Sequence, residues 1–108
     1  MVYREETYQA DKTKWKIDCS NFVITSGLSN IFEEHGIDGQ KFLHRHMCGD
    51  WGDLCEEDVE ANNQSFEWKG RLMSVWTARK ENHEEICKFW IITDSGWQVT
   101  TLLLPSEY

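Results

Sequence analysis

The chain has 108 residues and a mass of 12.8 kDa, which suffices for one compact domain and leaves no room for a second. Its 40% hydrophobic and 28% charged residues exclude a disordered tail, and its net charge of −8 argues against a protein that coats nucleic acid through the phosphates. No apolar segment has the length of a signal peptide or a membrane span, so we expect a cytoplasmic protein whose four cysteines stay reduced.

The beginning of the chain shows little periodicity. Residues 1–14 are polar, which predicts a loose arm or an edge strand ahead of a single domain over residues 15–108. Ser26 or Ser29 can cap a first helix that ends near His35, because the glycine that follows favours the left-handed turn at which helices stop. The domain is therefore expected to open with a short helix.

Two further helices are expected before the pattern changes. Asp38 can cap a helix over residues 39–47, and Asp53 can open a third helix that reaches about Phe66. Segments rich in β-branched and aromatic residues then predict strands over residues 71–79, 86–93 and 99–104. We predict an α+β fold in which short helices of the N-terminal two-thirds pack on a C-terminal three-stranded antiparallel β-meander.

Acidic residues gather in the middle of the chain. Residues 33–60 carry nine acids against two bases, a net charge of −7. Four acids at helical spacing form one stripe on the third helix: Asp53, Glu56, Glu57 and Glu60. Like charges at these spacings repel by roughly 0.2–0.5 kcal/mol per pair, and the helix dipole compensates only those in the first turn. The stripe is either a solvated face or a surface that docks on a basic partner.

The turn before the third helix leaves two alternatives open. Trp51 lies between two glycines and either folds onto the core or joins the acidic stripe as a contact residue. His46, Asp50, Asp58 and Asn62 could instead meet as a polar cluster, since a histidine beside carboxylates is the usual material of general acid–base catalysis. No nucleophile motif or phosphate-binding motif accompanies them.

A set of histidines and cysteines offers a further alternative. His44, His46, Cys48 and Cys55 could converge on one zinc ion, although their spacing differs from the C-x2–4-C pairs of standard structural sites. The helical pattern places Cys55 on the buried side of the third helix, where cysteine packs as a small hydrophobic residue. We therefore expect no cofactor or metal, with these four residues as the alternative site.

Several segments together resemble a known family. They read Arg45-His46-x-x-Gly49-Asp50-Trp51-Gly52, Glu57-Asp58 with Asn62, Ser74, Trp90-Ile-Ile-Thr93, and Thr100-Thr101-x-Leu-Leu-Pro-x-Glu-Tyr108. This combination is similar to a widespread family of small bacterial proteins that occur on plasmids, phages and other mobile elements. The family's loop after the Trp-Ile-Ile-Thr segment usually carries an arginine, which residues 94–98 lack. The resemblance implies an accessory role and names no activity.

Three functions follow as hypotheses. The first is a small acidic accessory protein that inhibits a host defence effector, of the CRISPR or restriction type, by occupying its basic nucleic-acid-binding surface through the acidic helix. The second is a small RNase-like enzyme with His46 as general acid–base, and the third is a zinc-binding domain. We expect a basic host protein as partner and no direct contact with nucleic acid or membrane. Exposed aromatic residues could also build a homodimer.

Overall fold

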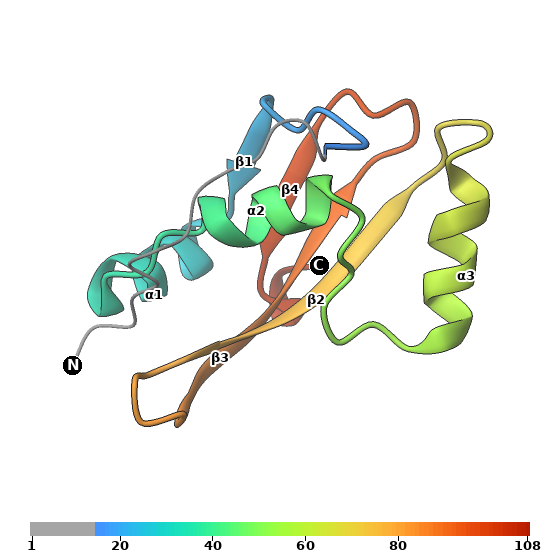
Figure 1. The fold of residues 1–108 in the computed structure, drawn as a ribbon. Helices are drawn as coiled ribbons and strands as arrows, with labels where there is room; N and C mark the ends of the chain where they lie inside the picture. Colours follow the sequence, from blue (N-terminus) through green and yellow to red (C-terminus); the bar gives the residue numbers. More distant parts are fainter. Residues whose placement is uncertain (1–14) are drawn as a thin grey trace.

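One short strand, three helices and then three strands follow one another along the chain in the structure, a computed structural model that describes residues 15–108 (Figure 1). The predicted arm or edge strand over residues 1–14 lies outside the described residues. In chain order the elements are β1 (Phe22–Ile24), α1 (Ser26–His35), α2 (Gln40–Met47), α3 (Glu56–Ser65), β2 (Leu72–Arg79), β3 (Glu85–Thr93), β4 (Thr100–Leu103) and the 3-10 helix η2 (Pro105–Glu107). No helix among the described residues combines the length and apolar composition needed to cross a membrane.

The four strands form one mixed sheet with the order β1-β4-β3-β2. β2 and β3 make a long antiparallel hairpin, and β4 returns antiparallel to β3. β1 lies at the edge and runs parallel to β4, with Val23 opposite Thr101. The first described strand is therefore placed beside the last one.

The α+β class is confirmed, but the predicted three-stranded antiparallel meander is wrong. The sheet has a fourth, parallel strand, and helices and strands are interspersed, since β1 precedes the helices and η2 follows β4. β1 has only three residues, too few for an alternating pattern to show in the sequence. Its flanks are held by β4, because Thr100 N donates to Asn21 O at 3.1 Å and Thr25 N donates to Leu102 O at 3.0 Å.

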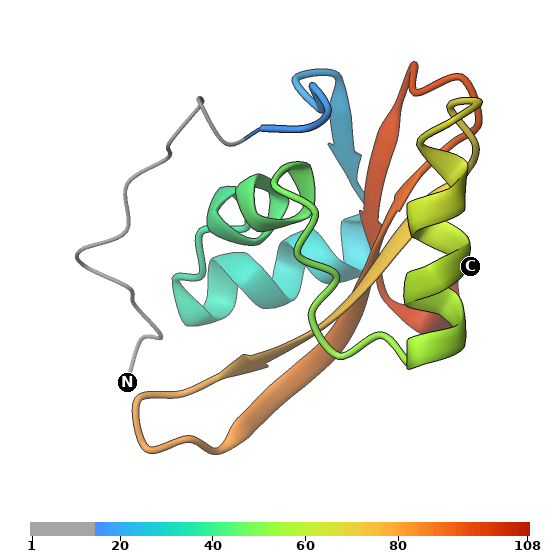
Figure 2. The same cartoon turned by 45° about the vertical axis from the view of Figure 1, so that its right-hand side comes forward.

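α1 and α2 cover one face of the sheet (Figure 2). Side chains alternate between the two faces of each strand, so every second residue of β2 and β4, and of the second half of β3, is buried beneath these helices. Phe89 of β3 packs edge-on against Phe32 of α1 and Phe42 of α2, with ring centroids 5.1 Å and 5.0 Å apart. Such pairs each add about 0.5–1.5 kcal/mol beyond area burial, so Phe89 fixes both helices to the central strand.

The start of α1 is capped from the far end of the sequence. The sequence predicts Ser26 or Ser29 as the cap, but Thr25 holds the N-cap position and its own side chain does not cap the helix. The carboxylate of Glu107, in η2, accepts hydrogen bonds from the Thr25 hydroxyl and from Gly27 N. The hydrogen bond from Thr25, helped by the backbone N–H of Leu104, lowers the pKa of Glu107. Glu107 thereby ties the last turn to the first helix.

α3 begins at Glu56, three residues later than predicted, because the chain before it runs along β2. Gly52 forms a β-bridge with Val75, and Asp53 N donates to Val75 O at 2.8 Å. Val75 N in turn donates to Trp51 O at 3.1 Å. The outer edge of β2 is thus covered by this segment, which reduces pairing with other chains along it.

Candidate functional site

His46 lies in the centre of the core rather than in an open site. It is fully buried, with Nδ1 2.7 Å from Ser74 Oγ on β2 and Nε2 2.9 Å from Thr93 Oγ1 on β3. Trp76 Nε1 donates to Ser74 Oγ at 2.6 Å, and the hydroxyl oxygens of Thr93 and Thr100 are 2.8 Å apart. One side chain of α2 is therefore linked by hydrogen bonds to three strands.

The partners of His46 satisfy a neutral imidazole. The indole of Trp76 can only donate, so Ser74 Oγ accepts there, and the hydroxyl groups of Ser74 and Thr93 can each donate to or accept from the ring nitrogen that they contact. A neutral ring, with one N–H donor and one acceptor nitrogen, therefore finds a partner on both sides. A second ring proton would place a charge in the core. Burial accordingly lowers the pKa of His46 from 6.5 to about 3.

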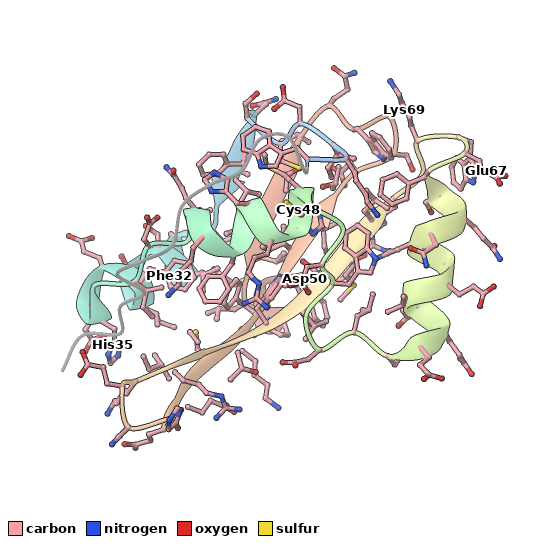
Figure 3. The ribbon with its side chains drawn as sticks, in the orientation of Figure 1. Phe32, His35, Cys48, Asp50, Glu67 and Lys69 are labelled. Atoms are coloured by element: carbon pink, nitrogen blue, oxygen red, sulfur yellow. The ribbon has the colours of Figure 1, made fainter. Side chains whose placement is uncertain are left out.

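The four residues of the predicted polar cluster do not meet. Asp50 is bonded to Arg45, with Nε and Oδ2 3.0 Å apart, and lies on the turn after α2 (Figure 3). Asp58 accepts a hydrogen bond from the Cys55 thiol at 3.2 Å at the start of α3. Since His46 is enclosed in the core, neither carboxylate shares a solvent-accessible site with it.

Asn62, the fourth member, holds α3 against the sheet. Its Nδ2 donates to Met73 O at 2.6 Å and its Oδ1 accepts from Met73 N at 3.2 Å.

We expect Asn62→Ala to lower the free energy of unfolding by about 1–2 kcal/mol, because both backbone groups of Met73 lose their partner and water at the sheet edge replaces it incompletely. Urea unfolding measures this, with the exposed Asn63→Ala as a matched control that should change stability by less than about 0.5 kcal/mol. Equal losses in the two variants would contradict this role.

The predicted zinc ligands have other surroundings. Both nitrogens of His46 are taken up by hydroxyl groups, and His44 stacks on Trp15 with ring centroids 5.5 Å apart. Cys48 is half-buried where α2 ends (Figure 3), and Cys55 is exposed rather than buried, because it precedes α3 instead of lying on its inner face. The described residues include no group of three or more His, Cys, Asp or Glu side chains placed to hold a metal ion.

Trp51 packs in the core, which is the first of the two alternatives that the sequence left open for it. Its side chain is 6% exposed and lies against His46, with ring centroids 5.3 Å apart, and against Phe66, with centroids 6.0 Å apart. A residue enclosed in this way cannot contact a partner. The predicted contact role of Trp51 is therefore incompatible with the folded structure.

The remaining predicted contact residues are all exposed, but only three of the four lie on α3, because Asp53 precedes this helix. Asp53, Glu56, Glu57 and Glu60 are all exposed, and we call them the acidic face. The other side of α3 holds the residues that pack on the sheet: Val59, Asn62, Ser65 and Phe66. Asp53 accepts a hydrogen bond from the Thr77 hydroxyl at 3.2 Å. Within residues 15–108, no carboxylate of the acidic face forms an ion pair.

An exposed tryptophan, which the sequence analysis did not single out, follows α3. Trp68 is 67% exposed, and its ring lies against Gly70, where an added Cβ would be 2.5 Å from ring carbons. The flanking Glu67 and Lys69 side chains point outward at this end of α3 (Figure 3). Lys69 has a left-handed φ of 53° and its carbonyl accepts from Gly96 N at 2.7 Å, so the turn is tied to the β3–β4 connection. The sequence signal that could have indicated an exposed tryptophan here is its position between two charged residues, Glu67 and Lys69.

The residues that carried the resemblance serve the fold in the described structure: Arg45, His46, Asp50, Trp51, Asn62, Ser74, Thr93, Thr100, Glu107 and Tyr108 all contact or bond other parts of the chain. No family model, curated protein or solved structure matches the chain. The function is therefore argued from the geometry and charge of the chain itself.

Proposed function

We propose that this is a non-enzymatic binding protein that uses the acidic face and Trp68 to dock on a basic surface of a partner protein. The observation that carries the proposal is the group of exposed carboxylates before and on α3 together with a 67% exposed tryptophan that follows the C-terminal end of this helix. Tryptophan is enriched among the residues that dominate interface energies, and charged rims steer complementary partners. The two features give the region around α3 both an aromatic anchor and a negative charge.

The acidic face is not needed to build the fold. Glu56 and Glu57 lie in the first turn of α3, where the helix dipole favours acids, but Glu60 lies beyond it and is repelled by Glu56 one turn away. The contacts that hold α3 come from its other side. The repulsion between these carboxylates lowers the stability of α3, and they make no ion pair within the described chain. They are therefore available to bind a partner.

The partner that best complements this surface is a nucleic-acid-binding protein. Such proteins carry basic grooves in which carboxylates can replace phosphates. The resemblance to proteins of mobile elements supports an accessory role, and we propose inhibition of a host defence effector in the cytoplasm. The RNase and zinc alternatives lack comparable support, because His46 is enclosed and neutral.

Charge reversal tests the proposal. We expect Glu56→Lys/Glu60→Lys to reduce capture of the partner from host lysate at least tenfold, since two attractive contacts become repulsive. Glu33→Lys/Glu34→Lys on α1 is the matched control, because both residues are exposed and the change in net charge is the same. Circular dichroism and urea unfolding show whether each variant folds.

The salt dependence and the control decide between outcomes. Wild-type capture should weaken as salt rises, because the Debye length falls from about 10 Å at 0.1 M to about 3 Å at 1 M. If both double variants lose capture equally, capture depends on the net charge of the protein and not on the acidic face. If folded Glu56→Lys/Glu60→Lys captures the same proteins as wild type, the acidic face is only solvated surface.

A further inference from the structure

The face of the sheet opposite α1 and α2 contains a small hollow beside η2. Its volume is about 230 Å³, and Ile92 and Leu103, each 5% exposed, line it as apolar residues. Arg71, Asp94 and Tyr108 line it as polar residues. An apolar floor with a few polar groups around it is the usual composition of a small-molecule site.

Arg71 and Asp94 occupy positions where an ion pair would normally form. Leu72 of β2 is paired with Thr93 of β3, and both side chains are buried on the face that α1 and α2 cover. Arg71 and Asp94 are the next residues along the two strands, so they are opposite each other and their side chains lie on the other face of the sheet. Opposite charges placed across two strands usually attract each other directly. Among the described residues, however, neither side chain forms an ion pair.

Tyr108 holds the guanidinium of Arg71 in another position. Arg71 Nη2 donates to the Tyr108 hydroxyl at 2.9 Å, and the guanidinium carbon lies 5.3 Å from the ring centroid. The ring of Tyr108 is itself packed edge-on against Trp90, with centroids 5.6 Å apart. A guanidinium has five N–H donors, and this contact uses one of them. The others make no hydrogen bond within the described chain.

Asp94 is the free anion of the hollow. Its carboxylate accepts no hydrogen bond from the described side chains or backbone, whereas Glu107, which also lines the hollow, is used by Thr25, Gly27 and Leu104. The hollow thus offers one cation, held by a hydrogen bond to Tyr108, and one anion, both with unused bonding capacity, above an apolar floor.

We propose that this hollow binds a small zwitterion, a free α-amino acid with a short aliphatic side chain. Its carboxylate takes the free N–H donors of Arg71, an arrangement in which arginine can bind both oxygens. Its ammonium group donates to Asp94, and its side chain covers Ile92 and Leu103. The ligand thereby completes the ion pair that Tyr108 keeps Arg71 from making directly.

Titration of the full-length protein with L-leucine, followed by amide and side-chain NMR shifts, tests the site. We expect saturable shifts at Ile92, Leu103 and Tyr108, with a Kd on the order of 1 mM. The probes 4-methylpentanoate, which lacks the amine, and 3-methylbutylamine, which lacks the carboxylate, should each bind at least tenfold more weakly. Equal binding of the three probes would show that only the apolar floor is recognised and would overturn the proposal.

Matched variants test whether Arg71 and Asp94 are the charged groups that bind the ligand. Arg71→Gln and Asp94→Asn should each weaken leucine binding at least tenfold, while Lys88→Gln and Glu85→Gln, at the far end of β3, should leave it unchanged. Tyr108→Phe should also weaken it, because Arg71 is then released toward Asp94. Absence of saturable shifts at about 50 mM leucine, far above the expected constant, would overturn the proposal, as would unchanged binding in folded Asp94→Asn.

Discussion

Between pH 7 and pH 5 the free energy of unfolding is expected to fall by about 2 kcal/mol, because His46 is neutral in the folded core and protonated in the unfolded chain. Its pKa is 6.5 when exposed and about 3 when buried. Below pH 6.5 the unfolded state therefore binds a proton that the folded state does not, so stability decreases as the pH falls. The slope approaches 1.36 kcal/mol per pH unit and continues toward pH 3, which gives about 3 kcal/mol at pH 4.

Urea unfolding at a series of pH values measures this effect. His46→Gln should be less stable at pH 7, because one amide cannot replace both hydrogen bonds, but it should lose the slope between pH 6.5 and 5. His35→Gln, on the last turn of α1, serves as the histidine control and should keep the slope. Among residues 15–108, the titratable neighbour bonded to this network is Cys19, whose Sγ is 3.8 Å from Thr93 Oγ1 and whose pKa burial raises, so it stays neutral in this range. An unchanged slope in His46→Gln would assign the acid sensitivity elsewhere.

Gly52→Ala is expected to cost about 2–4 kcal/mol, a large effect for the addition of one methyl group. A Cβ at this position would lie 2.1 Å from Val75 O and 2.9 Å from a ring carbon of Trp76, and the residue has a left-handed φ of 64°. The backbone carbonyl cannot turn away without breaking the hydrogen bond from Asp53 N. Overpacking of this kind costs about 1–3 kcal/mol, and the left-handed conformation costs a side chain about 1 kcal/mol more.

Gly96→Ala separates the two contributions. Gly96 also has a positive φ, 87°, but a Cβ there would meet nothing within 4 Å. Its substitution should cost only the conformational part, about 1 kcal/mol. The difference between the two midpoints of urea unfolding measures the steric clash at Gly52. Similar losses in both variants would show that the segment before α3 moves away from β2 without penalty.

The strands of the hairpin and the ends of α1 and α2 could be predicted because they depend on local pattern. The segment over residues 71–79, chosen for its β-branched and aromatic residues, differs from β2 by one residue, and the glycine after His35 does adopt a left-handed φ of 65°. β1 could not be predicted, since three residues show no periodicity and their partner, β4, lies at the other end of the sequence.

The site predictions failed where they needed distances between elements. Helical spacing correctly separated Glu56 and Glu60 from Asn62, but it gave no means of seeing that Asn62 bonds the edge of β2. His46 was placed among carboxylates because it is close to them in sequence. Its actual partners, Ser74 and Thr93, are neutral residues on strands that the sequence does not connect to α2.

The pairing of β1 with β4 has a consequence for synthesis of the protein. The register joins Phe22 to Thr100, and the helix that follows β1 is capped by Glu107. A growing chain therefore cannot complete the sheet or cap α1 until these late residues have left the ribosome. Until then the apolar side chains of α1 lack their cover, and contacts so distant in sequence slow the search for the native state. The interval between the synthesis of α1 and of β4 is when this chain is most exposed to aggregation and most dependent on chaperones.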